Sequence, residues 1–349
     1  MMKQAVLRAP ERLDVSQVER PALEPGDVLV RVESSLVCGT DIRIYQGTKK
    51  RNVTYPTVMG HEFAGTIAEV AGALPAGLSI GDQVAVYPLV PCDACVACVK
   101  DRGNICRNRV AFGYQLPGGF SQYVRVPAQA VEAGNLVPVP GVSAAEAAIV
   151  EPLACAYNGQ LLAGAPGAET MLVSGCGPLG LMHVRLAREL GVPRVVAVDP
   201  IPERLEAALA SGAELALSPG EGAAADVLEW TGGAGVDVLI AAVGRLDAVH
   251  PYLACLAPGA RVSMFAGFGG EGSVLEIPAN DIHYNEWSVV GASSCRLDGF
   301  TKIAEMISAG DLRVDDLVGT QFPIDDMAKA IDLAASGRDL RVGISPWKD

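Results

Sequence analysis

The pattern of apolar and polar positions changes character partway along the chain. Up to about residue 137, short apolar runs with β character are broken by glycine and proline, at residues 28–32, 65–70, 83–87 and 120–126. Short strands at this spacing predict a barrel-like β domain. From Pro138 onward, an alanine-rich and helix-like stretch over 144–163 comes first, and strand and helix patterns then alternate. This alternation predicts a parallel α/β sheet.

The strands of the second region are nearly all apolar. We expect them at residues 170–174, 194–198, 236–241 and 261–265, with helices at 179–190 and 202–210. Strands that are almost entirely apolar fit a sheet that helices cover on both faces. After about residue 291 the pattern predicts one more strand, helices over 299–308 and 324–336, and a last strand at 340–344. We expect this tail to return to the first domain.

The length of 349 residues suits two domains that each bury a core. The expected division is a catalytic domain of residues 1–151 and 291–349, and a dinucleotide-binding domain of residues 152–290. The fold class is therefore α/β, with a β-rich domain beside a doubly wound parallel sheet.

Composition and charge narrow the class of function. Half of the residues are hydrophobic and 19% are charged, which excludes a disordered chain. A net charge of −13 repels phosphate backbones and anionic lipid, so nucleic acid and membranes are not expected partners. Charged residues interrupt the first 20 positions, and no later run is apolar for about 20 residues. We therefore expect a cytoplasmic protein.

A glycine-rich loop carries the clearest motif. Gly175, Gly177 and Gly180 form G-x-G-x-x-G directly after an expected strand and at the start of an expected helix, and Asp199 ends the next strand. Such a loop lets the backbone approach a pyrophosphate at the helix N-terminus. Asp199 would hold the adenosine ribose and repel a 2′-phosphate, so NAD is favoured over NADP. We also expect Pro178, Leu179 and Arg204 to contact the cofactor.

Four of the nine cysteines lie close together in one loop. Cys92, Cys95, Cys98 and Cys106 have the spacing C-x2-C-x2-C-x7-C. Four thiolates on one short loop can surround a tetrahedral zinc ion and leave no open position, which predicts a structural site. An iron–sulfur cluster uses the same number of ligands and stays an alternative, as do unligated thiols.

A second set of metal-binding residue types is spread along the chain. It consists of Cys38, the neighbouring pair His61 and Glu62, and Glu151. One thiolate, one imidazole and one or two carboxylates can hold zinc with a position left open, as catalysis requires. Taken alone, His61 reads as a buried structural histidine and Glu62 as a surface charge. Their occurrence beside the other two motifs favours the metal.

Together these motifs resemble the zinc-containing medium-chain dehydrogenase family, within its sorbitol, threonine and cyclitol dehydrogenase branch. The resemblance covers essentially the whole chain. It rests on the Cys38-Gly39-Thr40-Asp41 run, Gly60-His61-Glu62, Gly81-Asp82-Gln83-Val84, the four-cysteine loop, Glu151-Pro152-Leu153, the glycine loop and Asp199. It implies a GroES-like catalytic domain, a Rossmann NAD domain, two zinc ions per chain, and a homodimer or homotetramer.

The resemblance also implies roles for individual residues. The catalytic zinc is held by Cys38 and His61, with Glu62 as third ligand or near neighbour, and Glu151 stands where simple alcohol dehydrogenases often have cysteine. Asp41 would orient His61, and Thr40 would pass the substrate proton outward. The usual relay histidine is replaced by Arg43, which cannot act as a base, so we expect a carboxylate, Glu62 or Glu151, to receive the proton through a water.

The expected substrate is a secondary alcohol of a polyol, cyclitol or aminocyclitol, or the matching ketone. Oxidation of a hydroxy amino acid of the threonine type is the first alternative, and a non-catalytic relative is a remote one. Arg43 would contact an anionic or multiply hydroxylated substrate, or be a simple surface arginine. Residues 267–273 and 288–295 are either the sheet edge that joins subunits or an internal strand.

Overall fold

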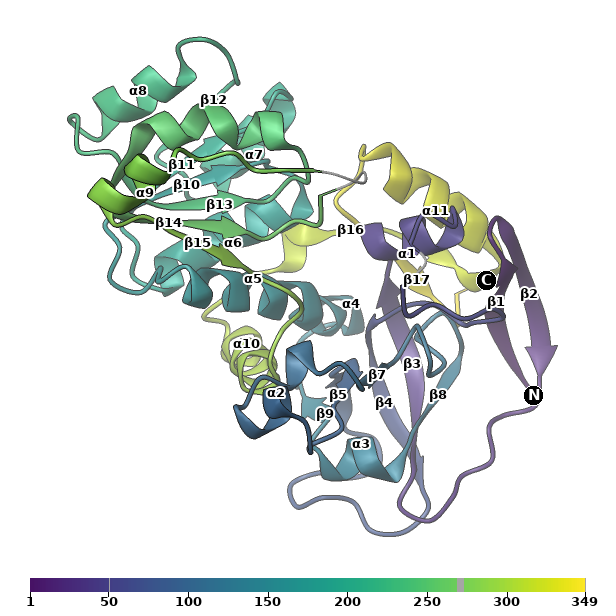
Figure 1. The fold of residues 1–349 in the computed structure, drawn as a ribbon. Helices are drawn as coiled ribbons and strands as arrows, with labels where there is room; N and C mark the ends of the chain where they lie inside the picture. The colour runs from purple at the N-terminus through teal and green to yellow at the C-terminus, as the bar shows by residue number, and fades with distance from the viewer. Residues whose placement is uncertain (50, 269–272, 349) are drawn as a thin grey trace. The chain divides into compact units, whose positions relative to one another are not determined.

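The computed structural model describes residues 1–49, 51–268 and 273–348 and divides the chain into two compact units (Figure 1). Unit 1 comprises Met1–Ala154 and Arg296–Asp349, and unit 2 comprises Cys155–Cys295. The last 54 residues of the chain thus belong to the same unit as the first 154. The two boundaries fall in helix α5 (Val150–Leu162) and just before helix α10 (Leu297–Ala309).

Unit 1 is built on an extended sheet whose strands follow the order β16-β17-β3-β4-β5-β9, with β8 also paired to β3. The bounds are β3 (Val28–Leu36), β4 (Glu62–Val70), β5 (Gln83–Val86), β8 (Tyr123–Val126), β9 (Leu136–Pro138), β16 (Val318–Pro323) and β17 (Arg341–Ser345). Two short antiparallel pairs accompany it: β1 (Met2–Ala9) with β2 (Arg12–Val18), and β6 (Leu89–Val90) with β7 (Val110–Ala111).

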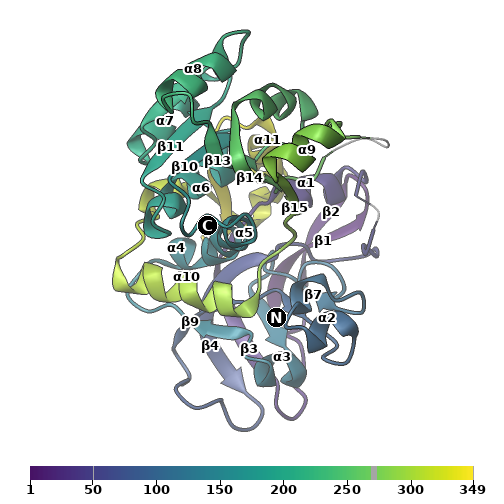
Figure 2. The same cartoon turned by 60° about the vertical axis from the view of Figure 1, so that its left-hand side comes forward.

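Helices close unit 1 at several places. Helix α4 (Ala144–Ala148) packs on β3 and β4, and α10 lies along α4 and β9 (Figure 2). Helix α1 (Gly39–Tyr45) packs against α11 (Met327–Ser336), and the apolar side chains between them include Ile44 and Ile331. Helices α2 (Val96–Val99) and α3 (Ala128–Glu132) are short. The tail thereby completes a core that the first segment begins.

Unit 2 is a parallel α/β layer. Among the described residues its sheet has the order β12-β11-β10-β13-β14-β15, with every pairing parallel, and Figure 1 shows helices on both of its faces. The strands are β10 (Thr170–Ser174), β11 (Arg194–Val198), β12 (Leu215–Leu217), β13 (Val236–Ala241), β14 (Leu256–Met264) and β15 (Ser288–Gly291). The remaining helices are α6 (Pro178–Glu189), α7 (Pro202–Ala210), α8 (Ala223–Trp230) and α9 (Ala279–Asn285). The predicted α/β class is confirmed.

Several predicted elements have other bounds in the structure. The helix expected over 324–336 begins as α11 at Met327, and the strand expected at 261–265 is the end of β14, which begins at Leu256. The single helix expected over 144–163 is two helices, α4 and α5, which meet at Ile149. The cause is Pro152, which donates no backbone hydrogen bond and whose ring would clash with the carbonyl four residues earlier. The strand expected at 120–126 is shorter and begins at Tyr123. Of the expected edge segments, part of 267–273 lies outside the described residues, whereas 288–291 forms strand β15 at the sheet edge.

No helix of the described residues is long and apolar enough to cross a bilayer.

Candidate active site and metal centres

Three strands of unit 1 deliver the first cluster to one end of the sheet. Strand β3 lies between β4 and β17, and its last residue, Leu36, faces both Glu62 at the start of β4 and Gly343 near the start of β17. Cys38 therefore follows β3 at the same end where β4 begins. The cluster is fixed by antiparallel strand pairing rather than by a flexible loop.

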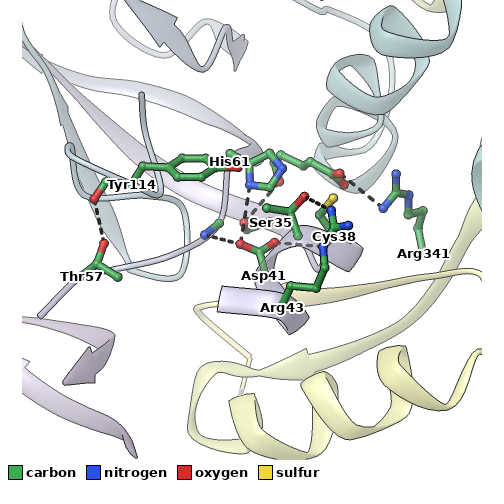
Figure 3. A network of polar contacts seen from close by, with 11 residues as sticks. Ser35, Cys38, Asp41, Arg43, Thr57, His61, Tyr114 and Arg341 are labelled. Atoms are coloured by element: carbon green, nitrogen blue, oxygen red, sulfur yellow. Dashed lines mark hydrogen bonds and ion pairs between the residues drawn. The ribbon is translucent and has the colours of Figure 1, made fainter. Parts of the chain in front are cut away.

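Cys38, His61 and Glu62 converge at this end. One potential ligand atom from each lies within 4.8 Å of the other two (Figure 3). Gly60 allows this approach, because its φ of +90° suits glycine and a Cβ would lie 2.8 Å from Phe120 and 2.9 Å from the Ser35 hydroxyl. The sequence motif thus becomes a compact set of sulfur, nitrogen and oxygen donors.

Several buried nitrogen and oxygen atoms of this cluster lack hydrogen bonds to the described residues. His61 is 7% exposed and Glu62 fully buried, yet His61 Nδ1 and both carboxylate oxygens of Glu62 have no hydrogen-bond partner in the described residues. Such orphaned buried polar atoms are costly unless something else satisfies them. A thiol, an imidazole and a carboxylate are ligands that zinc accepts, so the residues present fit this metal.

Arg341 is a member of this site that the motif search missed. It lies at the start of β17, is 5% exposed, and places Nη1 3.3 Å from Glu62 Oε1 (Figure 3). A single arginine opening an apolar strand was the only signal in the sequence. Its positive charge balances two groups of the cluster, the Glu62 carboxylate and the Cys38 thiolate.

Burial and neighbouring charges shift the pKa values of the three cluster residues in different directions. Burial alone would raise the pKa of Cys38, but attraction to His61 and Arg341 outweighs it and lowers the pKa to about 6. Burial raises the pKa of Glu62 to about 8 against the opposing pull of Arg341. Burial disfavours a charged His61, yet Asp41 dominates and raises its pKa well above the ordinary value. The thiolate is therefore available to a metal near neutral pH.

Asp41 links helix α1 to the histidine. Its Oδ2 accepts a 2.9 Å hydrogen bond from the backbone N–H of Cys38, which caps the helix, and Oδ1 accepts from Gly60 N–H at 3.4 Å. Oδ1 also lies 3.6 Å from His61 Nδ1, longer than a hydrogen bond but close enough for charge attraction. The predicted orienting residue therefore stands beside the imidazole.

Thr40 and Arg43 share one turn of α1. The Arg43 guanidinium donates to the Thr40 hydroxyl oxygen at 3.2 Å. A proton passed outward through Thr40 would meet a group that has no free lone pair to receive it. The helix offers no continuation of a relay at this point.

Glu151 lies in the first turn of α5 and is 8% exposed. It is not one of the residues whose ligand atoms meet within 4.8 Å at Cys38. Its negative charge nevertheless raises the pKa of two residues of the site, Arg341 and Tyr114. In both cases the effect of burial is larger, lowering the pKa of Arg341 and raising that of Tyr114. Tyr114, which the sequence analysis also missed, packs its ring 5.7 Å from that of His61 (Figure 3).

The four cysteines of the second cluster meet as predicted from their spacing. Sγ–Sγ distances are 3.5 Å for Cys95–Cys98, 3.7 Å for Cys95–Cys106 and 3.4 Å for Cys106–Cys92. A tetrahedron of zinc–sulfur bonds of 2.3 Å spaces its sulfurs about 3.8 Å apart, far beyond a disulfide bond. The backbone N–H of Ala94 is the main cause that lowers the pKa of Cys92 to about 6. The loop fits a metal held by four sulfurs.

In unit 2 the glycine loop joins β10 to α6. Gly180 packs so closely that a Cβ would lie 1.8 Å from the Gly175 carbonyl oxygen, whereas a Cβ on Gly177 would meet nothing within 4 Å. The loop is thus tight on its inner side and open where a phosphate would approach the N-terminus of α6. Pro178 and Leu179 form the first turn of that helix and are partly exposed.

Asp199 braces the same loop. It is 3% exposed, and its carboxylate accepts from the backbone N–H of Cys176 at 2.8 Å and of Ile201 at 3.0 Å. Arg204 Nη1 lies 3.7 Å from it. The open glycine loop and this buried carboxylate fit a dinucleotide.

A β unit with a zinc-compatible donor cluster and a parallel α/β unit with a dinucleotide loop define the class of two-domain zinc dehydrogenases. Family models agree: residues 24–140 match the alcohol dehydrogenase GroES-like domain, and residues 178–309 match the zinc-binding dehydrogenase model.

Individual relatives cover nearly the whole chain. Erythritol/L-threitol dehydrogenase of Mycolicibacterium smegmatis is 31% identical over 99% of this chain and 98% of its own. L-threonine 3-dehydrogenase of Pyrococcus furiosus is 30% identical over 94% of each chain. A solved structure of a candidate zinc-binding dehydrogenase from Sinorhizobium meliloti 1021, bound to NADP, superposes with a TM-score of 0.89 at 29% identity, over 99% of both chains.

This chain therefore belongs to the zinc-containing medium-chain alcohol dehydrogenase family, as its motifs predicted. It is an oxidoreductase that uses a nicotinamide cofactor.

Proposed function

We propose that this enzyme oxidises a secondary hydroxyl of a polyol, cyclitol or aminocyclitol, or reduces the matching ketone. The observation that carries the proposal is the buried cluster of Cys38, His61 and Glu62, in which His61 Nδ1 and both Glu62 carboxylate oxygens have no hydrogen-bond partner among the described residues. Zinc bound there would act as a Lewis acid on the substrate oxygen, while NAD bound to the glycine loop would exchange the hydride. Cys92, Cys95, Cys98 and Cys106 would hold a second, structural zinc.

In this proposal Cys38 and His61 hold the metal and Glu62 is the third ligand. The lowered pKa of Cys38 supports its part, since a ligand must be a thiolate. Asp41 keeps the imidazole oriented, and Arg341 offsets the negative charge of the donors. The chain thus supplies both the ligands and their orientation.

The proton released by the substrate alcohol needs an acceptor other than Thr40, whose oxygen already accepts from Arg43. Glu62 or Glu151, through a water, is the proposed acceptor, and Glu151 is favoured because Glu62 is engaged by Arg341. The variant Glu151→Gln should lower kcat at neutral pH by on the order of 100-fold while zinc content stays unchanged. Full turnover in this variant would remove Glu151 from the role.

NAD is the proposed cofactor rather than NADP, because the Asp199 carboxylate would repel a 2′-phosphate. Because the similar structure from Sinorhizobium meliloti is bound to NADP, the activities of this enzyme with NAD and with NADP should be measured side by side. We expect kcat/KM to be at least about 10-fold higher with NAD, and Asp199→Ala to narrow that ratio. Equal use of both cofactors by the unaltered enzyme would contradict the assignment.

The substrate class is tested by a panel. Purified protein is assayed for nicotinamide absorbance change with polyols, inositols, aminocyclitols and threonine, after bound zinc has been measured. The similarity to erythritol/L-threitol dehydrogenase supports the polyol class, and the similarity to L-threonine 3-dehydrogenase supports threonine as the alternative. Two zinc ions per chain with turnover of a polyol is the expected result. Two zinc ions with turnover of threonine alone would favour the alternative.

The enzyme is proposed to act in the cytoplasm as a homodimer or homotetramer. Its nine cysteines form no disulfide bond in the described residues, as a reducing compartment would keep them. Strand β15 is an edge strand in the described part of the sheet, and its Val289 is 44% exposed, which supports pairing with a second copy there. Light scattering after size exclusion would give the subunit number, and a monomer would contradict this.

A further inference from the structure

A group of basic side chains without carboxylate partners lies near the cluster of Cys38, His61 and Glu62 in unit 1. The chain carries a net charge of −13, yet residues 42–58 contain four basic residues and no acidic one. Arg43 and Arg51 lie in this segment and are exposed, Lys49 is partly buried, and Arg109 joins them from the loop after the four cysteines. We call Arg43, Lys49, Arg51 and Arg109 the basic rim.

The basic rim lies close to the proposed catalytic cluster. Lys49 Nζ is 5.5 Å from the centre of the Tyr114 ring, which is itself 5.7 Å from the His61 ring. The ammonium group and the imidazole therefore contact the same aromatic ring. On the other side, Arg43 reaches Thr40 and stands beside Cys38 and Asp41 (Figure 3).

The loop that carries Lys49 is fixed to helix α1. The backbone N–H groups of Thr48 and Lys49 both donate to the Arg43 carbonyl oxygen at 3.0 Å, and the Thr48 hydroxyl donates to it at 3.2 Å. This turn holds Lys49 next to Arg43. The two cations are positioned by backbone geometry rather than by chance proximity of long side chains.

These cations repel one another. Burial lowers the pKa of Lys49, and repulsion from Arg43 lowers it further. Arg109 and Arg51 act in the same direction. Arg109 is fixed in this place, since its Nη1 donates to the Cys106 carbonyl at 2.7 Å. Bringing like charges together is unfavourable unless an anion joins them.

Elsewhere in unit 1, arginines commonly find a carboxylate. Those in ion pairs include Arg8, Arg31, Arg125, Arg296 and Arg313. Within residues 1–49, 51–268 and 273–348, no member of the basic rim has such a partner. No carboxylate of the described protein therefore neutralises the rim, and the one attraction that raises the pKa of Lys49 comes from the Cys38 thiolate.

We propose that the substrate carries an anionic group, a carboxylate or a phosphate monoester, and that the basic rim binds it while the metal cluster receives the hydroxyl to be oxidised. This rests on the proposed function and narrows it to an anionic polyol. Lys49 and Arg43 are the primary contacts, because they lie nearest the cluster. Guanidinium and ammonium groups bind both kinds of oxyanion with charge-assisted hydrogen bonds.

The test compares three series of matched carbon number and stereochemistry: neutral hexitols, hexonates and hexitol phosphates, each with saturating NAD. We expect kcat/KM for one anionic series to exceed that for the neutral hexitols by on the order of 10- to 100-fold, and the better anion identifies the group. Inorganic phosphate should compete with the anionic substrate and not with NAD.

The variant Lys49→Met should raise KM for the anionic substrate by about 10-fold or more, with kcat and the KM for NAD unchanged. Lys302→Met, which removes an exposed lysine on α10, is the matched control and should leave kcat and both KM values unchanged. Equal or better turnover of neutral hexitols would overturn the inference, as would a rise in the KM for NAD in place of that for substrate. No turnover of any series would instead contradict the proposed function.

Discussion

The two cysteine-containing clusters of unit 1 offer the same kind of ligand in opposite settings. In the four-cysteine loop all donors are thiols within one short segment, and the neighbouring side chains Val96 and Val99 are 74% and 75% exposed. In the other cluster Glu62 begins strand β4, His61 directly precedes it and Cys38 caps helix α1, and Arg341 is buried with them. The four-cysteine loop has little apolar packing of its own to fix its conformation, whereas buried side chains and paired strands fix the positions of Cys38, His61 and Glu62.

This difference is the reason why we expect zinc to have a structural role in the four-cysteine loop and a catalytic role at Cys38, His61 and Glu62. Where the loop has little apolar packing, ligand bonds must supply the folding energy, and four equal donors leave no open position. Where strand pairing already fixes the donors, a metal bound there would be free to act on a substrate. Mutations that remove a ligand should therefore separate stability from activity.

The largest effect is expected for Cys38→Ala. Loss of this thiolate should lower kcat/KM by on the order of 1000-fold, because Lewis-acid stabilisation is worth several kcal/mol of barrier. Zinc content should fall from two to one per chain while the melting temperature stays within about 3 °C, since strands β3, β4 and β17 still pair. Activity assay, metal analysis and calorimetry check this.

Cys255→Ala, at a buried cysteine of unit 2, is the control for cysteine loss as such. It should keep both zinc ions and most of the activity. A Cys38→Ala protein that melts far below the control would show that the cluster also holds the fold together, and the contrast between the two sites would disappear.

Cys106→Ser should give the opposite result. Cys106 is fully buried among the sulfurs, so its loss should release the other zinc and lower the melting temperature by on the order of 10 °C. The loop should become the first site of limited proteolysis, whereas kcat per folded molecule at low temperature should fall less than about threefold. Unchanged stability with one zinc lost would mean that apolar packing, not metal, supports the loop.

Sequence reasoning placed the elements of unit 2 well. Residues 170–174, 194–198 and 236–241 were expected as strands and are β10, β11 and β13 with the same bounds. Buried parallel strands are recognisable because nearly every position is apolar and turns bound them. The break at Ile149 was not predicted, because the alanine-rich composition on both sides is typical of one continuous helix. Pro152 was the signal in the sequence that could have indicated it.

The site was predictable only where a motif is local. The four-cysteine loop could be found from its spacing, and Cys38 and His61 from short motifs that occur in the same chain as that loop and the glycine loop. The structure brings each set together. Arg341 could not, because it reaches Glu62 through the pairing of β17 with β3, which no local pattern reveals. The basic rim likewise depends on Tyr114 and Arg109, which come from a different loop than Lys49.

Arg341→Met tests how far a buried ion pair stabilises the cluster of Cys38, His61 and Glu62. It leaves Glu62 without its ionic partner and should lower the free energy of unfolding by about 3 kcal/mol. Burial already raises the pKa of Glu62 from 4.5 to about 8, so this group stabilises the fold fully below pH 4.5 and loses that contribution as pH rises through about 8. The deficit of the variant should therefore be larger at pH 8 than at pH 5.

Denaturant titration at both pH values measures this. The double variant Glu62→Gln/Arg341→Met should recover part of the loss, because no buried charge is then unpaired. A deficit that is the same at both pH values, with no recovery in the double variant, would assign the effect to lost packing of the arginine side chain.

The smallest effect is expected at the surface of the four-cysteine loop. Val96→Lys/Val99→Lys replaces two highly exposed apolar side chains of α2, and exposed substitutions change stability by about 0.5 kcal/mol or less. The melting temperature should shift by less than about 2 °C, and both zinc ions should remain. A fall as large as that of Cys106→Ser would mean that these valines are covered in the working enzyme. Since neither lies against a core in unit 1, that cover would have to come from outside it, and a change in subunit number measured by light scattering would identify a second copy as its source.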